Sequence, residues 1–258
     1  MGKSASVRKN EIALKTALIS EGTKEFGAIL AAGYGSAPVP IVILGPSGSG
    51  RTTLARLIHG ASGRTGEFIS VSCAAYPGKE LERELFGPGK TPPGRARAPG
   101  ALALADGGTL FLDEIGAISL EAQARLVKAI QSGVVCPRCG KGKNTGCALI
   151  STTRHDPQNL VEFGKLNPDF LRCLSGLGVR LKPLREAKTE IMPLIARFAT
   201  GKRPPVFSKE ARNFLLSYDW PGNLRELKRF VEIISGSKNP GKTITMETAQ
   251  NQIRWHFY

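Results

Sequence analysis

A glycine-rich segment that follows an apolar run constrains the fold of this chain most strongly. Residues 45–53 read Gly45-Pro46-Ser47-Gly48-Ser49-Gly50-Arg51-Thr52-Thr53, directly after the apolar run Ile41–Leu44. This is the phosphate-binding pattern G-x-x-x-x-G-K-[ST] with arginine in place of lysine. In such a loop, backbone N–H groups and the following helix N-terminus bind phosphate oxygens, and the Thr52 hydroxyl binds Mg²⁺. The segment therefore predicts a nucleotide site on a strand–loop–helix unit.

Short apolar runs recur along the first 180 residues and are continuous rather than alternating, which is typical of strands buried on both faces. They are Ile41–Leu44, Phe68–Val71, Leu110–Leu112, Ala148–Ser151 and Val179–Leu181. Helical segments lie between several of them, including Thr52–His59 and a helix capped by Ser119. The alternation of strands and helices predicts an α/β fold with a parallel sheet.

From about Leu184 the pattern changes to helices alone. Ser208 is expected to cap one of them, and Asn223 with Glu226 three residues later resembles a capping box that opens another. We therefore predict two domains, an α/β nucleotide-binding domain at residues 1–184 and a helical lid at residues 185–258.

A second motif lies about 60 residues after the glycine-rich loop. The apolar run Thr109–Leu112 ends in Asp113 and Glu114. Two carboxylates at a strand end are often no more than solvated side chains. Together with the loop they predict that Asp113 and Thr52 hold Mg²⁺ and that Glu114 is catalytic, orienting an attacking water.

Composition narrows the partners and the compartment. The chain of 258 residues has 36 Lys and Arg against 21 Asp and Glu, a net charge of +15. This balance favours nucleic acid or acidic partners, which the basic loops Lys90–Arg97 and Arg138–Lys143 would contact, although basic charge also simply aids solubility. No secretory leader is visible, and the uncharged stretch Phe26–Gly45 is broken by glycine and proline. We expect a cytoplasmic chain that does not enter a membrane.

Three cysteines resemble part of a metal site. Cys136-Pro137-Arg138-Cys139-Gly140 is similar to one half of a zinc ribbon, and Cys147 would be a third ligand. His155 or Cys173 would supply a fourth. The second C-x-x-C is absent, so the alternative is a surface hairpin with free thiols.

Five strings resemble the AAA+ domain of bacterial enhancer-binding proteins, the sigma-54-dependent transcription activators. They are the glycine-rich loop, Val71–Ala75 with Glu84–Gly87, Ala105–Gly116, Pro183–Glu186, and Tyr218-Asp219-Trp220-Pro221-Gly222-Asn223-Leu224-Arg225-Glu226-Leu227. The resemblance covers residues 35–250. It implies an AAA+ P-loop NTPase sheet with an all-helical lid, ATP or ADP as ligand, assembly with other AAA+ subunits, and Arg225 as the lid residue that contacts nucleotide.

The departures from the family pattern fall at its functional positions. Arg51 replaces the lysine of the loop, and Ser72 replaces the asparagine that restrains the catalytic glutamate. The sigma-54-gripping loop G-A-F-T-G-A is replaced by Pro88–Arg97. Arg154 takes the sensor I position, and of the two arginine fingers only Arg172 remains, because the first is Asn167. No helix-turn-helix is visible before Tyr258.

This pattern predicts a degenerate AAA+ domain with a regulatory role in transcription, in which binding survives better than hydrolysis and sigma-54 remodelling is impaired. One alternative is a working AAA+ ATPase with slow turnover that uses Arg172 in a neighbouring subunit. Another is a non-enzymatic interaction module whose basic loops bind nucleic acid or a protein partner.

Overall fold

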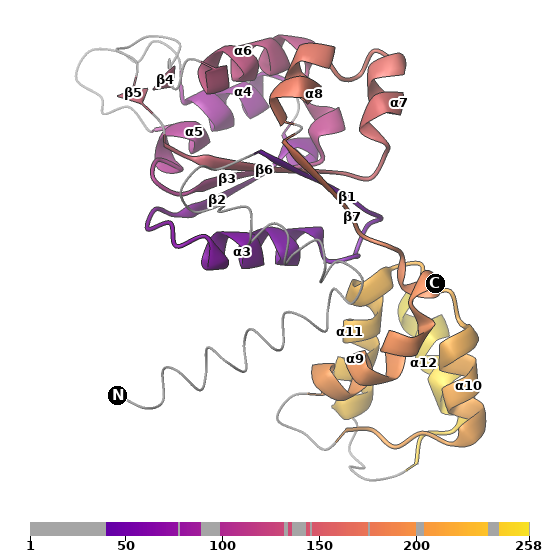
Figure 1. Cartoon of the computed structure of the whole chain (residues 1–258). Coiled ribbons are helices and arrows are strands. Elements are labelled where there is room, and N and C mark those ends of the chain that lie inside the picture. The colour runs from indigo at the N-terminus through magenta and orange to yellow at the C-terminus, as the bar shows by residue number, and fades with distance from the viewer. Residues whose placement is uncertain are drawn as a thin grey trace, which may run out of the picture. The chain divides into compact units, whose positions relative to one another are not determined.

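The computed structural model describes residues 40–76, 78–88, 99–131, 134–135, 143–144, 146–174, 176–199, 204–236 and 243–257. They form two compact units (Figure 1). The first contains the described residues up to Gly45 together with Arg51–Arg180, and the second contains Pro46–Gly50 together with Leu181 onward.

The first unit is built on a five-stranded sheet in the order β2-β3-β6-β1-β7, in which every neighbouring pair is parallel. The strands are β1 (Ile41–Leu44), β2 (Phe68–Ser72), β3 (Thr109–Asp113), β6 (Ala148–Thr153) and β7 (Leu177–Arg180). Four of the predicted runs lie wholly within strands, the fifth (Val179–Leu181) overlaps β7 at its first two residues, and the predicted parallel α/β sheet is confirmed. A separate antiparallel pair joins β4 (Val134–Val135) to β5 (Lys143–Asn144).

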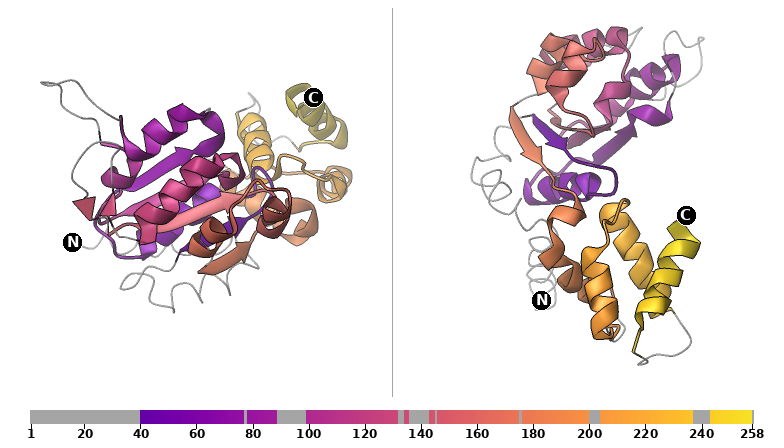
Figure 2. Two further views of the ribbon diagram at one scale, coloured as in Figure 1. Left: turned by 90° about the horizontal axis from the view of Figure 1, so that it is seen from above. Right: turned by 90° about the vertical axis from the view of Figure 1, so that its right-hand side faces the viewer.

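Helices cover both faces of the sheet (Figures 1 and 2). One face carries α3 (Arg51–Ala61), and the other carries α4 (Lys79–Phe86), α5 (Ala101–Leu104), α6 (Leu120–Gln131), α7 (Pro157–Glu162) and α8 (Pro168–Leu174). Strand β3 shows why its apolar run is continuous. Leu110 and Leu112 join the core that includes Leu126 of α6, whereas Phe111 stacks on Phe68 with 5.4 Å between ring centroids. Phe68 in turn lies 5.5 Å from the ring of His59 on α3.

Two glycines bring the starts of β2 and β3 into close contact. A Cβ on Gly66 would lie 2.3 Å from the Gly108 nitrogen, and a Cβ on Gly108 would lie 2.1 Å from the Glu67 carbonyl oxygen. The same backbones exchange hydrogen bonds, from Gly66 N–H to the Gly107 carbonyl at 3.1 Å and from Thr109 N–H to the Glu67 carbonyl at 2.9 Å. A side chain at either glycine would push these backbones apart.

The second unit is helical. Its helices are α9 (Ile191–Phe198), α10 (Lys209–Ser217), α11 (Asn223–Ser235) and α12 (Met246–Phe257), with short 3-10 turns at Leu184–Glu186 and Lys188–Glu190. The predicted N-caps are present in both units. The Ser208 hydroxyl accepts a hydrogen bond from Ala211 N–H at 3.1 Å, and the Ser119 hydroxyl accepts one from Ala122 N–H at 3.2 Å.

The turn between α10 and α11, residues 218–226, forms a compact structure that we call the helical corner. Trp220 is fully buried, donates its indole N–H to the Leu215 carbonyl at 3.0 Å and meets Phe230 edge to face. The predicted capping box differs in detail. Glu226 accepts hydrogen bonds from Gly222 N–H at 2.6 Å and from the Tyr218 hydroxyl at 3.0 Å. Gly222, not Asn223, is therefore the N-cap of α11.

Candidate functional site

The glycine-rich loop lies between β1 and α3, as predicted. Gly48 and Gly50 have φ angles of +76° and +98°, which residues with side chains rarely adopt. Between them, the Ser49 hydroxyl oxygen is buried and makes no hydrogen bond to any described residue. A buried hydroxyl without a hydrogen-bond partner lowers the stability of the fold, and a bound ligand could supply the missing hydrogen bond.

Within the second unit, the start of α11 contacts the loop. Asn223 adopts a left-handed backbone with φ of 53°, accepts from Leu184 N–H at 2.8 Å and donates to the Ser47 carbonyl at 2.9 Å. A Cβ on Gly48 would lie 2.1 Å from the Gly222 carbonyl oxygen and 3.3 Å from the Arg225 Cβ. The Cβ atom of Arg225, which the family resemblance predicts to bind nucleotide, thus lies beside the predicted phosphate loop.

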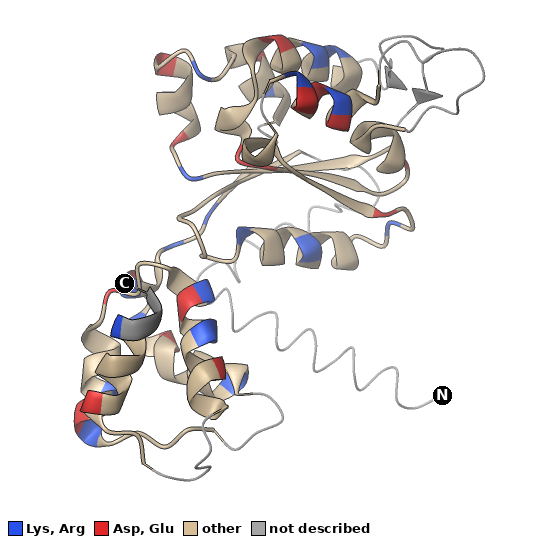
Figure 3. Ribbon diagram, turned by 180° about the vertical axis from the view of Figure 1, so that it is seen from behind, with Lys and Arg blue, Asp and Glu red and all other residues tan. Residues whose placement is uncertain are grey.

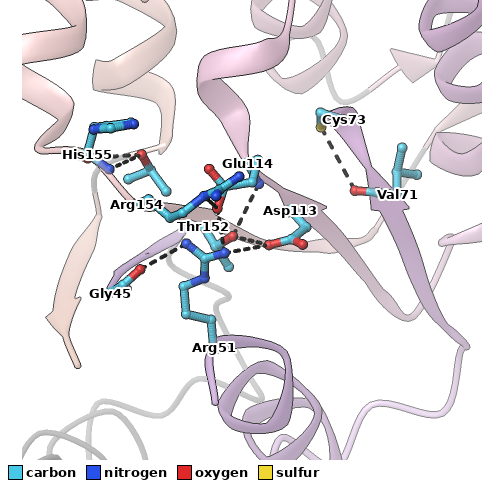
Figure 4. A network of polar contacts seen from close by, with 10 residues as sticks. Gly45, Arg51, Val71, Cys73, Asp113, Glu114, Thr152, Arg154 and His155 are labelled. Atoms are coloured by element: carbon cyan, nitrogen blue, oxygen red, sulfur yellow. Dashed lines mark hydrogen bonds and ion pairs between the residues drawn. The ribbon is translucent and has the colours of Figure 1, made fainter. Parts of the chain in front are cut away.

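The two predicted carboxylates follow each other at the end of β3, and a threonine of the neighbouring strand β6 connects them (Figure 4). The Thr152 hydroxyl donates to Asp113 Oδ1 at 2.5 Å and accepts from Glu114 N–H at 3.2 Å. Glu114 itself has a left-handed backbone, with φ of 63°. Such strain in a non-glycine residue is concentrated at functional sites.

Two arginines neutralise these carboxylates. Arg51 donates from Nη1 to the Gly45 carbonyl at 2.9 Å, while its Nη2 pairs with Glu114 Oε1 and lies 3.6 Å from Asp113 Oδ1. Arg154, just beyond the end of β6, places Nε 3.0 Å from the same Glu114 oxygen. We call Arg51, Asp113, Glu114, Thr152 and Arg154 the strand-end cluster (Figure 4).

The side chains of this cluster differ in how far they are exposed to solvent. The side chains of Arg51 and Glu114 are 9% and 13% exposed, whereas that of Arg154 is 50% exposed.

The thiol of Cys73, which lies near the cluster, is also buried. Its desolvation, with the negative charge of Asp113 as the next cause, raises its pKa to about 12. Cys73 is therefore a neutral core residue and not a nucleophile.

The side chains of the remaining predicted residues make no hydrogen bond or ion pair with the cluster among the described residues. Thr52 and Thr53 are exposed in the first turn of α3. Arg172 is 78% exposed on α8 and pairs with Asp169 of the same helix. Ser72 lies opposite Asp113 across the β2–β3 pair, but among the described residues the Glu114 carboxylate pairs with Arg51 and Arg154 and not with Ser72.

The predicted zinc site has no support. Cys136 and Cys139 lie outside the described residues, and Cys147 and Cys173 are half-buried. Across the part of the chain that the structure describes, no three His, Cys, Asp or Glu side chains are grouped to hold a metal.

The structure covers little of the two predicted basic loops. The loops Lys90–Arg97 and Arg138–Lys143 also lie outside the described residues, apart from the backbone of Lys143 and the flanks of the first loop. In the described part, Lys and Arg are interspersed with Asp and Glu in both units (Figure 3). None of the described helices has the length and apolar character needed to cross a membrane.

Sequence reasoning missed Thr152 and the pairing of Arg154 with Glu114. A signal was present, because Ser151, Thr152 and Thr153 end an otherwise apolar strand with hydroxyls. Polar residues at the carboxyl end of a parallel strand lie at the edge of the sheet where such folds bind ligands. Adjacency of β6 and β3 was needed to assign Thr152 to the carboxylates, and the sequence does not state strand order.

Comparison with known proteins identifies relatives of both units. The family model described as Sigma-54 interaction domain matches residues 23–180, and the one described as AAA+ ATPase lid domain matches residues 185–256. The transcriptional regulatory protein FlbD of Caulobacter vibrioides is 39% identical over 199 residues, which are 73% of this chain and 44% of FlbD. The Psp operon transcriptional activator of Escherichia coli is 38% identical over 205 residues, 75% of this chain and 63% of that protein.

Solved structures of NtrX are similar in fold to this chain. The crystal structure of NtrX from Brucella abortus in complex with ADP has a TM-score of 0.77 and 26% identity, covering 95% of this chain and 59% of NtrX. The NtrX structure in complex with ATP has a TM-score of 0.76. The chain thus spans 44% to 63% of the length of these three relatives.

Proposed function

The chain belongs to the sigma-54 interaction domain family of AAA+ proteins, and from that membership we propose that it binds ATP or ADP with Mg²⁺ while hydrolysing ATP slowly. The resemblance to sigma-54-dependent activators that the sequence motifs indicate is confirmed at the level of the family. We place this activity in the cytoplasm, in the regulation of transcription.

The loop supports nucleotide binding. Its two left-handed glycines turn the backbone between β1 and α3, and the Ser49 hydroxyl has no partner among the described residues. NtrX, which is 26% identical to this chain over the aligned residues, was crystallised with ADP and with ATP. Backbone N–H groups of residues 46–52 would receive the phosphates, and Arg225 begins beside Gly48.

The residues also suit a magnesium ion. Thr52 is exposed at the start of α3, and the Asp113 carboxylate is 27% exposed, so both offer the oxygen ligands that Mg²⁺ prefers. The ion would offset phosphate charge when bound. Thr152 orients Asp113 for this role through its hydrogen bond of 2.5 Å.

Slow hydrolysis rests on one observation: Glu114, the residue that would polarise the attacking water, is paired with two guanidinium groups. A carboxylate held in two ion pairs is fixed in direction and is not free to accept a hydrogen bond from the attacking water. Arg51 contributes further, because its planar fork is not a compact ammonium that fits between phosphates.

We propose that the working unit is an assembly of AAA+ subunits, homo- or hetero-oligomeric. The exposed Arg172 is suited to reach the site of a neighbouring subunit, and remodelling of sigma-54 is impaired by the sequence of Pro88–Arg97.

Titration with a fluorescent ATP analogue, paired with a phosphate-release assay, tests the proposal. We expect binding by the native chain, affinity about tenfold weaker in Arg51→Ala, and turnover far below the roughly 10 s⁻¹ typical of enzymes. Arg51→Lys should raise turnover at least several-fold if the other residues of the site are sound. Turnover near the enzyme median in the native chain would instead show a working ATPase. No binding would show a non-enzymatic interaction module.

A further inference from the structure

The Glu114 carboxylate is held from two sides by residues distant in sequence. Arg51 reaches it from α3 and Arg154 from the end of β6, and both contact the same buried oxygen, Oε1. The left-handed backbone at Glu114, with its N–H bonded to Thr152, fixes where the side chain starts. The two guanidiniums fix where it ends.

The two arginines differ in how firmly they are held. The Arg51 side chain is 9% exposed and also bonds the Gly45 carbonyl, so moving it would leave buried polar groups without partners. The Arg154 side chain is 50% exposed, and its contact with Glu114 is the one ion pair it makes among the described residues. Water can replace Glu114 as its partner. Arg154 is therefore the member of the pair that can leave at small cost.

We propose that Arg154 is a positioning residue that restrains Glu114 in the nucleotide-free chain, and that the terminal phosphate of ATP breaks this ion pair. The inference rests on the nucleotide site proposed above. A phosphate oxygen is a strong acceptor for guanidinium, and the added negative charge also repels the Glu114 carboxylate. ADP lacks the terminal group and leaves the pair intact.

The proposed restraint differs in position from the one that the family resemblance implies. The family resemblance assigns restraint of the glutamate to the residue at position 72, on β2. Among the described residues Glu114 makes no hydrogen bond or ion pair with Ser72, whereas Arg154 reaches it from just beyond β6, on the other side of β3. The side chain that we propose as the restraint thus lies on the opposite side of β3 from position 72.

A double-mutant cycle on nucleotide affinity tests the inference without requiring turnover. Arg154→Gln is made in the native background and in the Glu114→Gln background, and the four proteins are titrated with ATPγS and with ADP. If ATP breaks the pair, the effect of Arg154→Gln on ATPγS affinity should be three- to tenfold more favourable in the native background than in the Glu114→Gln background, a range of about the size expected for one ion pair. For ADP the two backgrounds should agree within about twofold.

Controls separate this role from a general structural one. Arg180→Gln removes an exposed arginine that pairs with Asp156 at 3.4 Å, and it should show no coupling to Glu114. Arg154→Lys keeps the charge and should restore most of the coupling. Equal coupling with both nucleotides, or none, would overturn the inference while leaving nucleotide binding in place. If the native chain binds neither nucleotide, the proposed function fails, and the release by ATP fails with it.

Discussion

The helical corner and the strand-end cluster both place residues with side chains in left-handed backbone, but they use the conformation differently. In the corner, Trp220 and Asn223 have φ of 49° and 53°, and their side-chain donors bond to backbone carbonyls of the same unit. In the cluster, Glu114 has φ of 63°, and its carboxylate is balanced only by the charges of two arginines. The corner is therefore complete without a ligand, whereas the cluster retains interactions that a ligand can exchange.

This contrast predicts that changes in the corner cost stability, while changes in the cluster cost binding. The largest effect should come from Trp220→Ala, which removes a fully buried indole from the core of the helical unit. We expect a loss of about 3–5 kcal/mol in the free energy of unfolding of that unit. This loss can be measured by chemical denaturation, with amide hydrogen exchange in α10 and α11 as the readout for the helical unit. Val206→Ala, at a side chain of the same unit that is 56% exposed, is the matched control and should change stability by less than about 0.5 kcal/mol.

Glu226→Ala should have the next largest effect. It leaves Gly222 N–H and the Tyr218 hydroxyl without their acceptor, which should cost about 1–3 kcal/mol of unfolding free energy. Tyr218→Phe removes only one of the two bonds and should cost less. A similar loss in both variants would show that the cap on Gly222 contributes little, and the corner would then be less complete than we infer.

Thr152→Val tests the cluster. The replacement keeps the shape and removes the hydroxyl that bonds both Asp113 and Glu114. We expect Mg²⁺-dependent nucleotide affinity to fall several-fold, with a loss of stability of only about 1 kcal/mol. Ser151→Ala is the control on the same strand, because its hydroxyl bonds the Ile41 carbonyl and not a carboxylate. If both variants bind nucleotide equally well, Thr152 is a packing residue only.

At neutral pH the smallest effect concerns Cys73, which lies beside the cluster but belongs to the core. Its pKa of about 12 in the folded chain lies above the ordinary value of 9.0, so the folded state keeps the proton that the unfolded state releases. The resulting contribution to stability is present below pH 9 and is lost as the pH rises toward 12. At pH 8, iodoacetamide should label Cys173 and spare Cys73, as followed by mass spectrometry. Equal labelling of both would show that the strand end opens readily.

The sequence predicts the parts of this molecule that depend on local patterns. Continuous apolar runs identify the three central strands because their residues are buried on both faces, and they also locate the edge strands β2 and β7, which are only partly buried. Ser119 and Ser208 identify two helix starts because their hydroxyls accept the hydrogen bonds of N-caps. Asn223 was assigned wrongly as a cap. A short motif does not state which residue takes the left-handed conformation, and here that residue turns its amide toward Leu184 and Ser47.

The site is predicted less completely for a different reason. Asp113 and Glu114 follow from the motif, but the partner of Glu114 is 40 positions away at Arg154, on a strand whose place in the sheet the sequence does not give. The resemblance instead favoured Ser72, which lies on the opposite side of β3. Long-range ion pairs depend on strand order and on side-chain length together, and neither is a local property.

The contact between Gly66 and Gly108 affects the strand ends that carry the carboxylates, although it lies at the opposite end of β2 and β3. Asp113 is five residues along β3 from Gly108, about 16 Å at the rise of an extended strand. Because both backbones meet where no Cβ fits, the two strands can be aligned in one way only, and a slip of one residue would turn every side chain to the wrong face. The glycine pair therefore fixes the register of β2 against β3 along the whole length of both strands. Two residues at the opposite end of the strands thus determine which side chain of β2 lies beside the acidic end of β3, where Ser72 is opposite Asp113.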